Sequence, residues 1–328
     1  MMISNIPKRK NKGDVPHYLR DLIFKYDYHF EDKEEIILSF YENVNRMVFL
    51  PNKVLAIVHK DFEASIKIWS TVDGRLITHK ILDTFIHDIK TIDDNIIFTD
   101  SGSFLKMWDA NMNLEILSDD TTIRDIDILD MKIAISSHKI KILDFDTRIS
   151  KSIAIDNIFR KIKFLPDGRI VGYSTEGVLK IWSDDLLCLY TCNCYSSQGD
   201  YCFDVTSNVV YYTEKGEVAI LNTQTYISEV ILKCEPCNIQ IHRNLLLLNF
   251  DEWLIVYDLK SKELRSKQFE FLIESVATLP NDQIMILLDN DELATLDSGK
   301  FKSKISIFYV LPDGRVIGVE NHQFKIWI

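Results

Sequence analysis

The cysteines are the residues of this sequence with the clearest capacity for chemistry. All six of them fall between positions 188 and 237. Cys192 and Cys194 form one close pair, and Cys234 and Cys237 form a second pair with the Cys-x-x-Cys spacing that zinc sites use. Four thiolates on neighbouring loops could hold one tetrahedral Zn²⁺. Because Cys-x-Cys is not the usual partner spacing, we expect reduced, unligated thiols and keep a zinc site as the alternative.

Signatures of catalysis are missing from the sequence. It has no glycine-rich phosphate loop, no His-Glu-x-x-His and no serine nucleophile between glycines. Only 11 of the 328 residues are glycine, which leaves few backbone positions able to cradle a phosphate. The eight histidines are dispersed, and acidic pairs such as Asp119-Asp120 fall in predicted turns, where we expect them to be solvated. We therefore expect no enzymatic activity and no cofactor.

Composition and charge narrow the class of protein. With 46% hydrophobic and 27% charged residues, the sequence is typical of a soluble globular chain. Its net charge of −11 argues against nucleic-acid binding, because the phosphate backbone would be repelled. No apolar run approaches the roughly 18 residues of a membrane span. The basic N-terminus lacks the apolar stretch of a secretory signal, so we expect an intracellular protein, cytoplasmic or nuclear, without a disulfide framework.

A repeated motif predicts the strands and turns that would position any functional residue. An aromatic or leucine anchor, often preceded by Lys-Ile, recurs eight times at intervals of 31 to 39 residues. The anchors are Trp69, Trp108, Leu143, Trp182, Leu221, Tyr257, Leu296 and Trp327. Four of them follow a proline turn by 15 to 18 residues, as in Leu165-Pro166-Asp167-Gly168-Arg169. Strands and tight turns alternate between these marks, so each repeat predicts about four short strands, as in a propeller blade.

The proline turn, the small polar turn and the Lys180-Ile181-Trp182-Ser183 type of ending resemble the repeat of the WD-repeat (WD40-type) β-propeller family. The resemblance covers residues 35–328. It implies an all-β fold, a β-propeller of four-stranded antiparallel blades. The Gly-His pair that opens the family's repeat is missing throughout, so the family's buried His–Ser–Asp–Trp network is not carried over to this chain.

The number of blades follows from the two ends of the sequence. The sequence stops at Ile328, directly after an anchor, so the final blade needs an outer strand from elsewhere. The β-prone segment 35–40 precedes the first blade, and we expect it to pair with the final blade and close the ring. This arrangement favours eight blades. Seven is the alternative, if one repeat, of which 123–155 is the weakest, forms a loop.

Residues 1–34 are expected to form a separate N-terminal region. Residues 1–13 read as a flexible basic arm, and a short amphipathic helix is predicted from Asp14 onward, with Tyr18 and Leu22 on its apolar face. The helix resembles the opening helix of an F-box, which implies recruitment of a ubiquitin-ligase scaffold. The alternatives are that the helix docks on the propeller or on another partner.

Taken together, these features predict a non-enzymatic scaffold that presents propeller loops to other proteins. Aromatic residues in predicted turns are candidate contact anchors, together with Tyr18 and Leu22 of the helix. They are Phe62, Phe104, Tyr195, Tyr201 and Trp253. Trp253 is in phase with Tyr257, so filling the core between blades is its alternative role. Alternative functions are an F-box-like substrate adaptor of a ubiquitin ligase, a structural component of a larger assembly, and a propeller enzyme.

Overall fold

The computed structural model describes most of the chain from residue 36 to residue 327. The described ranges are 36–39, 43–50, 53–60, 63–70, 75–82, 84–100, 104–109, 111–118, 120, 122–194, 203–206, 209–214, 217–234, 238–279, 283–296, 299–310, 316–320 and 323–327. Every regular element in these ranges is a β-strand. The search of these ranges for a helix long and apolar enough to cross a membrane found none. The arm and helix predicted for residues 1–34 lie outside the described residues.

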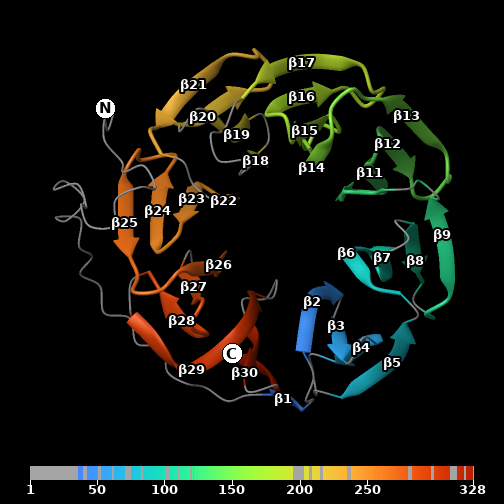
Figure 1. The fold of residues 1–328 in the computed structure, drawn as a ribbon, viewed down its shortest axis with the longest axis vertical. Coiled ribbons are helices and arrows are strands. Elements are labelled where there is room, and N and C mark those ends of the chain that lie inside the picture. Colours follow the sequence, from blue (N-terminus) through green and yellow to red (C-terminus); the bar gives the residue numbers. More distant parts are fainter. Residues whose placement is uncertain are drawn as a thin grey trace. The chain divides into compact units, whose positions relative to one another are not determined.

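The strands are grouped in antiparallel sets of four, which we call blades, and within blades 1 to 7 the four strands follow one another in sequence (Figure 1). The chain divides into two compact units. The described residues of the first unit run from 120 to 268 and form blades 3 to 6. Their strands are β10 (Asp125–Leu129), β11 (Lys132–Ser136), β12 (Lys139–Asp144) and β13 (Ser150–Ala154); β14 (Phe159–Phe164), β15 (Ile170–Ser174), β16 (Val178–Trp182) and β17 (Cys188–Asn193); β18 (Phe203–Thr206), β19 (Val209–Glu214), β20 (Glu217–Asn222) and β21 (Ser228–Leu232); and β22 (Asn238–His242), β23 (Leu245–Phe250), β24 (Trp253–Asp258) and β25 (Leu264–Gln268).

The second unit combines the two ends of the described chain and forms blades 1, 2, 7 and 8. Blades 1 and 2 contain β2 (Asn43–Leu50), β3 (Lys53–Lys60), β4 (Glu63–Ser70) and β5 (Leu76–Leu82), then β6 (Ile86–Ile92), β7 (Asn95–Asp100), β8 (Leu105–Trp108) and β9 (Leu114–Ser118). Blades 7 and 8 contain β26 (Ile273–Thr278), β27 (Ile284–Leu288), β28 (Glu292–Thr295), β29 (Gly299–Val310), β30 (Val316–Glu320), β31 (Gln323–Trp327) and β1 (Ile36–Ser39).

One long strand belongs to both of the last two blades. The first half of β29 pairs with β28, from Gly299 to Lys304, and its second half pairs with β30, from Ile305 to Val310. Hydrogen bonding therefore runs without interruption through seven strands, and the described residues form seven hydrogen-bonded sheets that contain eight four-stranded sets. The sequence favoured this number of blades.

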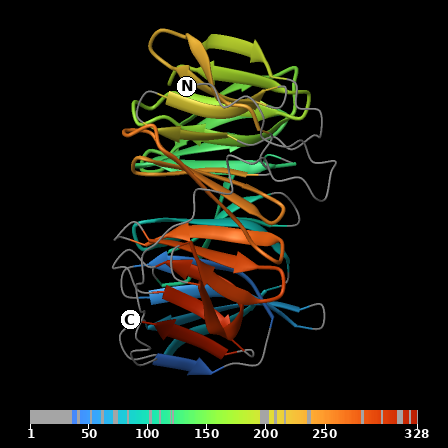
Figure 2. The same cartoon turned by 90° about the vertical axis from the view of Figure 1, so that its left-hand side faces the viewer.

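The N-terminal strand completes the final blade, as predicted. β1 is antiparallel to β31, with Ile36 opposite Ile326 and Ser39 opposite Gln323. Figures 1 and 2 show β1, in blue, beside the red strands of the C-terminal region. The pairing covers an edge of β31 that would otherwise expose unpaired backbone groups.

The strands of one blade differ in how far they are buried, and this difference explains which residue types each strand contains. Second strands are buried along their whole length, as in β15 and β27, and consist mainly of large apolar residues. Outer strands such as β13 and β17 are largely exposed. Of the predicted anchors, Trp69, Trp108, Leu143, Trp182, Leu221 and Leu296 are all nearly inaccessible to solvent. Tyr257 is half-buried. The anchors therefore belong to the cores between strands rather than to the surface.

The predicted proline turn forms between β14 and β15. The amide of Gly168 donates to the carbonyl of Leu165 at 2.9 Å, and the amide of Leu165 donates to the carbonyl of Arg169 at 2.7 Å. Gly168 has φ +87°, a left-handed conformation that glycine adopts without a steric penalty. The turn joins two strands whose side chains pack into the core of blade 4.

Gly172 of β15 is closely packed by two aromatic rings, and we predict that Gly172→Ala destabilises the protein. A Cβ atom at this position would lie 2.9 Å from Cδ1 of Phe159 and 3.0 Å from Cζ3 of Trp182. Both neighbours are buried rings in an edge-to-face contact, with centroids 4.9 Å apart, so neither can move easily. We expect the free energy of unfolding to fall by about 1–3 kcal/mol. Urea denaturation of both proteins measures this difference, and an unchanged midpoint would contradict it.

Candidate interaction surface

Similar turns join the third and outer strands of blades 3 to 6, and the turn of blade 4 is one residue shorter than the other three. The residue after each anchor accepts hydrogen bonds from amides of the turn, as Asp144 does from Thr147 and Asn222 from Thr225. These bonds lower the pKa of the Asp144 carboxyl, with the amide of Thr147 as the main cause. A left-handed residue then closes each turn. The four such residues are Arg148, Leu186, Tyr226 and Lys262, with φ between 57° and 62°.

The residue that follows each closed turn projects its side chain into solvent. Its carbonyl accepts the amide of the residue after the anchor, at 2.9 to 3.0 Å, so the four positions are structurally equivalent. They are Ile149, Leu187, Ile227 and Glu263. The three aliphatic side chains are 69%, 66% and 68% exposed. We call Ile149, Leu187 and Ile227, on blades 3, 4 and 5, the rim row.

Direct contacts tie blades 3 and 4 together beside the rim row. The ammonium of Lys151, two residues after Ile149, donates to Oδ1 of Asp185 at 2.6 Å and to the carbonyl of Asp184 at 3.0 Å. Asp185 in turn lies two residues before Leu187. The hydrogen bond between the two side chains lowers the pKa of Asp185 and raises that of Lys151. Two members of the rim row are thereby attached to one inter-blade contact.

A second set of contacts joins blades 4 and 5 at the same level. The rings of Tyr190 and Tyr226 stack with centroids 5.2 Å apart and an interplanar angle of 7°. The guanidinium of Arg169 donates to the carbonyl and to Oγ1 of Thr223, and it also reaches the hydroxyl of Tyr226 at 3.4 Å. Because Tyr226 directly precedes Ile227, these contacts fix the third member of the rim row relative to blade 4.

The aromatic residues predicted as contact anchors have mixed outcomes. Tyr18, Leu22, Phe62, Tyr195 and Tyr201 lie outside the described residues. Phe104 is half-buried, its amide donates to Oδ1 of Asp100, and the Lys106 ammonium lies 5.7 Å from its ring centroid. Trp253 is half-buried at the start of β24, opposite Phe250 and Gln268 in register. Neither ring is among the strongly exposed apolar side chains.

Of the four thiols named in the zinc alternative, Cys192 and Cys194 come together. The sulfur atoms of Cys192 and Cys194 are 3.1 Å apart at the end of β17. Cys234 is buried in the core between blades 5 and 6, and Cys237 lies outside the described residues. Within the described part of the chain, no three histidine, cysteine or acidic side chains form a group suited to a metal ion. Cys192 and Cys194 are thus a close pair of thiols that are not joined by a disulfide.

Carboxylates on the innermost strands act as links between blades, a role that the sequence did not reveal. Oδ2 of Asp125 and Oδ2 of Asp127 on β10 accept the amides of Ile162 and Phe164 on β14, each at 2.7 Å. Asp204 on β18 accepts the amide of Ile241 on β22 at 2.8 Å. Since the donors are backbone amides, no side-chain motif in the sequence could identify these bonds.

The prediction that Asp119-Asp120 is a solvated pair is wrong for Asp120. Its side chain is only 6% exposed and forms ion pairs with Lys139 at 2.6 Å and Lys141 at 3.0 Å. Both lysines lie on β12, where alternation places them on the same side of the strand. Burial of the carboxylate is stabilised by this double pairing, which a turn-like local sequence does not indicate.

Comparison with known proteins identifies the fold. No known protein family matches the sequence, and no curated protein is similar to it in sequence. Among solved structures, the computationally designed Ika8 protein matches with a TM-score of 0.68 and 13% identity, over 88% of this chain and 96% of that one. BamB from Moraxella catarrhalis matches with a TM-score of 0.64 and 11% identity, over 90% and 99% of the two chains.

A WD40 domain is also similar in structure. The Pan2 WD40 domain of Neurospora crassa matches with a TM-score of 0.55 and 10% identity, over 87% of this chain and 89% of that one. At identities this low, the similarity concerns the fold alone. Together with the four-stranded antiparallel sets, it shows that this chain has the all-β fold of a β-propeller.

Proposed function

We propose that this β-propeller is a non-enzymatic protein-interaction module and that it binds a partner protein through the rim row. The observation that carries this proposal is the exposure of Ile149, Leu187 and Ile227 at one equivalent position of three successive blades. Single exposed aliphatic residues are normal on protein surfaces. A repeated apolar position on blades that are tied to one another is instead typical of an interaction site.

The turn geometry itself does not require an apolar residue at this position. Blade 6 has Glu263 there, with the same backbone hydrogen bond and the same left-handed residue before it. A polar side chain is therefore compatible with the fold, and exposing a large aliphatic side chain has no evident structural benefit. Burial under a partner would remove its apolar area from water, which contributes about 25 cal/mol for each Å².

Charge around the rim row indicates the chemistry of the partner. The exposed charged residues close to it in sequence are four acidic ones, Asp146, Asp184, Asp185 and Glu229, and two basic ones, Arg148 and Lys151; the whole chain has a net charge of −11. A complementary partner segment would present aliphatic or aromatic side chains flanked by lysine or arginine. Such complementarity speeds association and favours the correct orientation more than it adds affinity.

The inner-strand carboxylates support a non-catalytic role. Asp125, Asp127 and Asp204 are acidic residues of the kind that a propeller enzyme would need at its centre. Each of them accepts a backbone amide from the following blade. Their oxygen atoms are thus engaged in joining blades, and this arrangement favours a structural use over acid–base chemistry.

The rim row can be tested by affinity purification of the full chain. The variant Ile149→Glu/Leu187→Glu/Ile227→Glu is compared with Ser152→Glu/Thr191→Glu/Ser228→Glu, which adds the same charge to exposed positions of the same outer strands. We expect the rim variant to lose its partner by at least about tenfold, because each apolar anchor contributes about 1 kcal/mol or more. The control variant is expected to keep it. Equal retention by both variants would overturn the proposal.

Two further experiments test the chemistry of the partner and the alternative function as an F-box-like adaptor. A photo-crosslinking residue at position 187 should capture a partner peptide that has apolar residues flanked by basic ones; an acidic or purely polar peptide would contradict the proposed partner class. A chain without residues 1–30 should recover the same partner. If only the full chain recovers a ubiquitin-ligase scaffold, the F-box-like adaptor is the better function.

A further inference from the structure

Cys192 and Cys194 form a close thiol pair at the point where the chain leaves blade 4. Their sulfur atoms are 3.1 Å apart, and neither thiol is in a disulfide. Cys192 is the penultimate residue of β17 and lies opposite Leu179 of β16. Residues two positions apart on an extended strand point to the same side of it. Cys192 and Cys194 are such a pair, which explains why their sulfur atoms meet.

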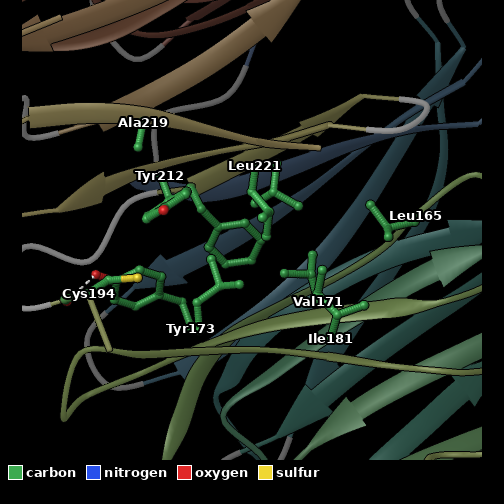
Figure 3. Close-up of a cluster of buried hydrophobic side chains, with 11 residues drawn as sticks. Leu165, Val171, Tyr173, Ile181, Cys194, Tyr212, Ala219 and Leu221 are labelled. Atoms are coloured by element: carbon green, nitrogen blue, oxygen red, sulfur yellow. Dashed lines mark hydrogen bonds between the residues drawn. The ribbon is translucent and has the colours of Figure 1, made fainter. Parts of the chain in front are cut away.

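The two thiols differ sharply in their surroundings. Cys194 is fully buried in a core cluster shared by blades 4 and 5 (Figure 3). Its amide donates to the carbonyl of Gly177 at 2.5 Å, and its carbonyl accepts the hydroxyl of Tyr173 at 2.8 Å. Cys192 lies on the outer strand and is only half-buried. An oxidant in solution can thus reach Cys192 but not Cys194.

We propose that Cys192 and Cys194 are a redox-active dithiol that closes reversibly to an intramolecular disulfide. Cys192 is the residue that reacts with the oxidant, and Cys194 is the resolving residue. The sulfur atoms need to approach by only about 1 Å to reach the S–S bond length of about 2 Å. This inference is independent of the rim row and of the proposed partner.

The chemistry balances with a peroxide as the oxidant. The Cys192 thiolate attacks one peroxide oxygen, the O–O bond breaks, and Cys192 becomes a sulfenic acid while one water forms. The sulfur of Cys194 then attacks the sulfur of Cys192, the S–O bond breaks, and a second water leaves with the Cys194 proton. The two sulfur atoms together lose two electrons, and the peroxide gains them. Exchange with a dithiol reductant restores both thiols.

The surroundings favour a disulfide that is easily reduced again. Backbone and core contacts hold Cys194 in place, so ring closure must displace Cys192 and the end of β17 instead. A bond formed across a single intervening residue in this way is strained, and strained disulfides have higher reduction potentials. Cys188, on the same strand, has Thr191 Oγ1 and the Tyr190 carbonyl near its sulfur, so it serves as an internal reference thiol.

Peptide mapping tests the pair directly on the full chain. The reduced protein is treated with graded hydrogen peroxide, blocked with N-ethylmaleimide and digested with chymotrypsin. Cleavage after Tyr190 and Tyr195 releases Thr191–Tyr195, which contains Cys192 and Cys194 and no other cysteine. We expect this peptide to appear unalkylated and about 2 Da lighter than its dithiol form. Dithiothreitol should reverse the change.

Two variants make the assignment specific. Cys188→Ser should keep the response, and Cys192→Ser should abolish it. Three outcomes would overturn the proposal: full alkylation of both thiols after oxidation, a bond from either thiol to another cysteine, or conversion of Cys192 to a sulfinic acid without a disulfide.

Discussion

Replacing Trp182 with alanine is expected to lower the free energy of unfolding by about 3–5 kcal/mol, the usual range for a buried tryptophan. The indole is 2% exposed and belongs to a cluster that spans blades 3 and 4. It meets Phe159 edge-to-face and lies over the α-carbon of Gly172. Removing it leaves a cavity that the rigid second strand β15 cannot fill, so the lost contacts are not replaced.

Trp253→Ala provides the control for this prediction. Trp253 is also a strand tryptophan of the first unit, but it is half-buried and is not an anchor of the repeat. We expect a clearly smaller loss for this variant. Urea denaturation followed by far-ultraviolet circular dichroism compares both variants with the parent chain. Equal midpoints for the two variants would mean that the anchor position has no special role in packing.

The repeat was predictable because its signals are local. Proline turns, the glycine at 168 and the anchors lie within a few residues of the elements that they specify, and the strands form where alternation and turn residues place them. Small differences have local causes as well. In blade 4 the outer strand β17 begins only at Cys188, two residues after Leu186. Leu186 instead adopts a left-handed φ of 62° and buries its side chain in the core.

The shared strand β29 explains an irregularity in the repeat. The last two anchors, Leu296 and Trp327, are only 31 residues apart, whereas all other intervals are 35 to 39. One strand of 12 residues serves as the outer strand of blade 7 and the first strand of blade 8, so the connection between two separate strands is missing. Spacing alone shows a shorter repeat but does not identify which element is shared.

The candidate site was less predictable than the fold. Phe104 and Trp253 were proposed as contact residues because they are aromatic and lie in predicted turns. Both are half-buried, because each packs against its own hairpin or neighbouring strands. The rim row had a usable signal, a large aliphatic residue five or six positions after the anchors Leu143, Trp182 and Leu221. This signal indicates an exposed side chain only because of the hydrogen-bonded turn that precedes the residue, and that turn is visible only in the three-dimensional structure.

Asp204→Ala is expected to lower the free energy of unfolding by about 2–4 kcal/mol, because one carboxylate links three blades. Oδ1 forms an ion pair with Lys163 of β14, and Oδ2 accepts the amide of Ile241 of β22. The side chain of Asp204 is 13% exposed. Alanine would leave the ammonium without this partner and the amide without this acceptor, and both groups are only partly accessible to water.

Asparagine at the same position separates the two contributions. Asp204→Asn keeps an acceptor for the Ile241 amide but removes the charge, so its cost should be clearly below that of Asp204→Ala. The ion pair is measured by a double-mutant cycle with Lys163→Met, in which the coupling energy should be at least about 0.5 kcal/mol. If Asp204→Ala and Asp204→Asn cost the same, the bond to Ile241 contributes nothing. If the cycle shows no coupling, Lys163 is not stabilised by the carboxylate, and Asp204 joins blades 5 and 6 alone.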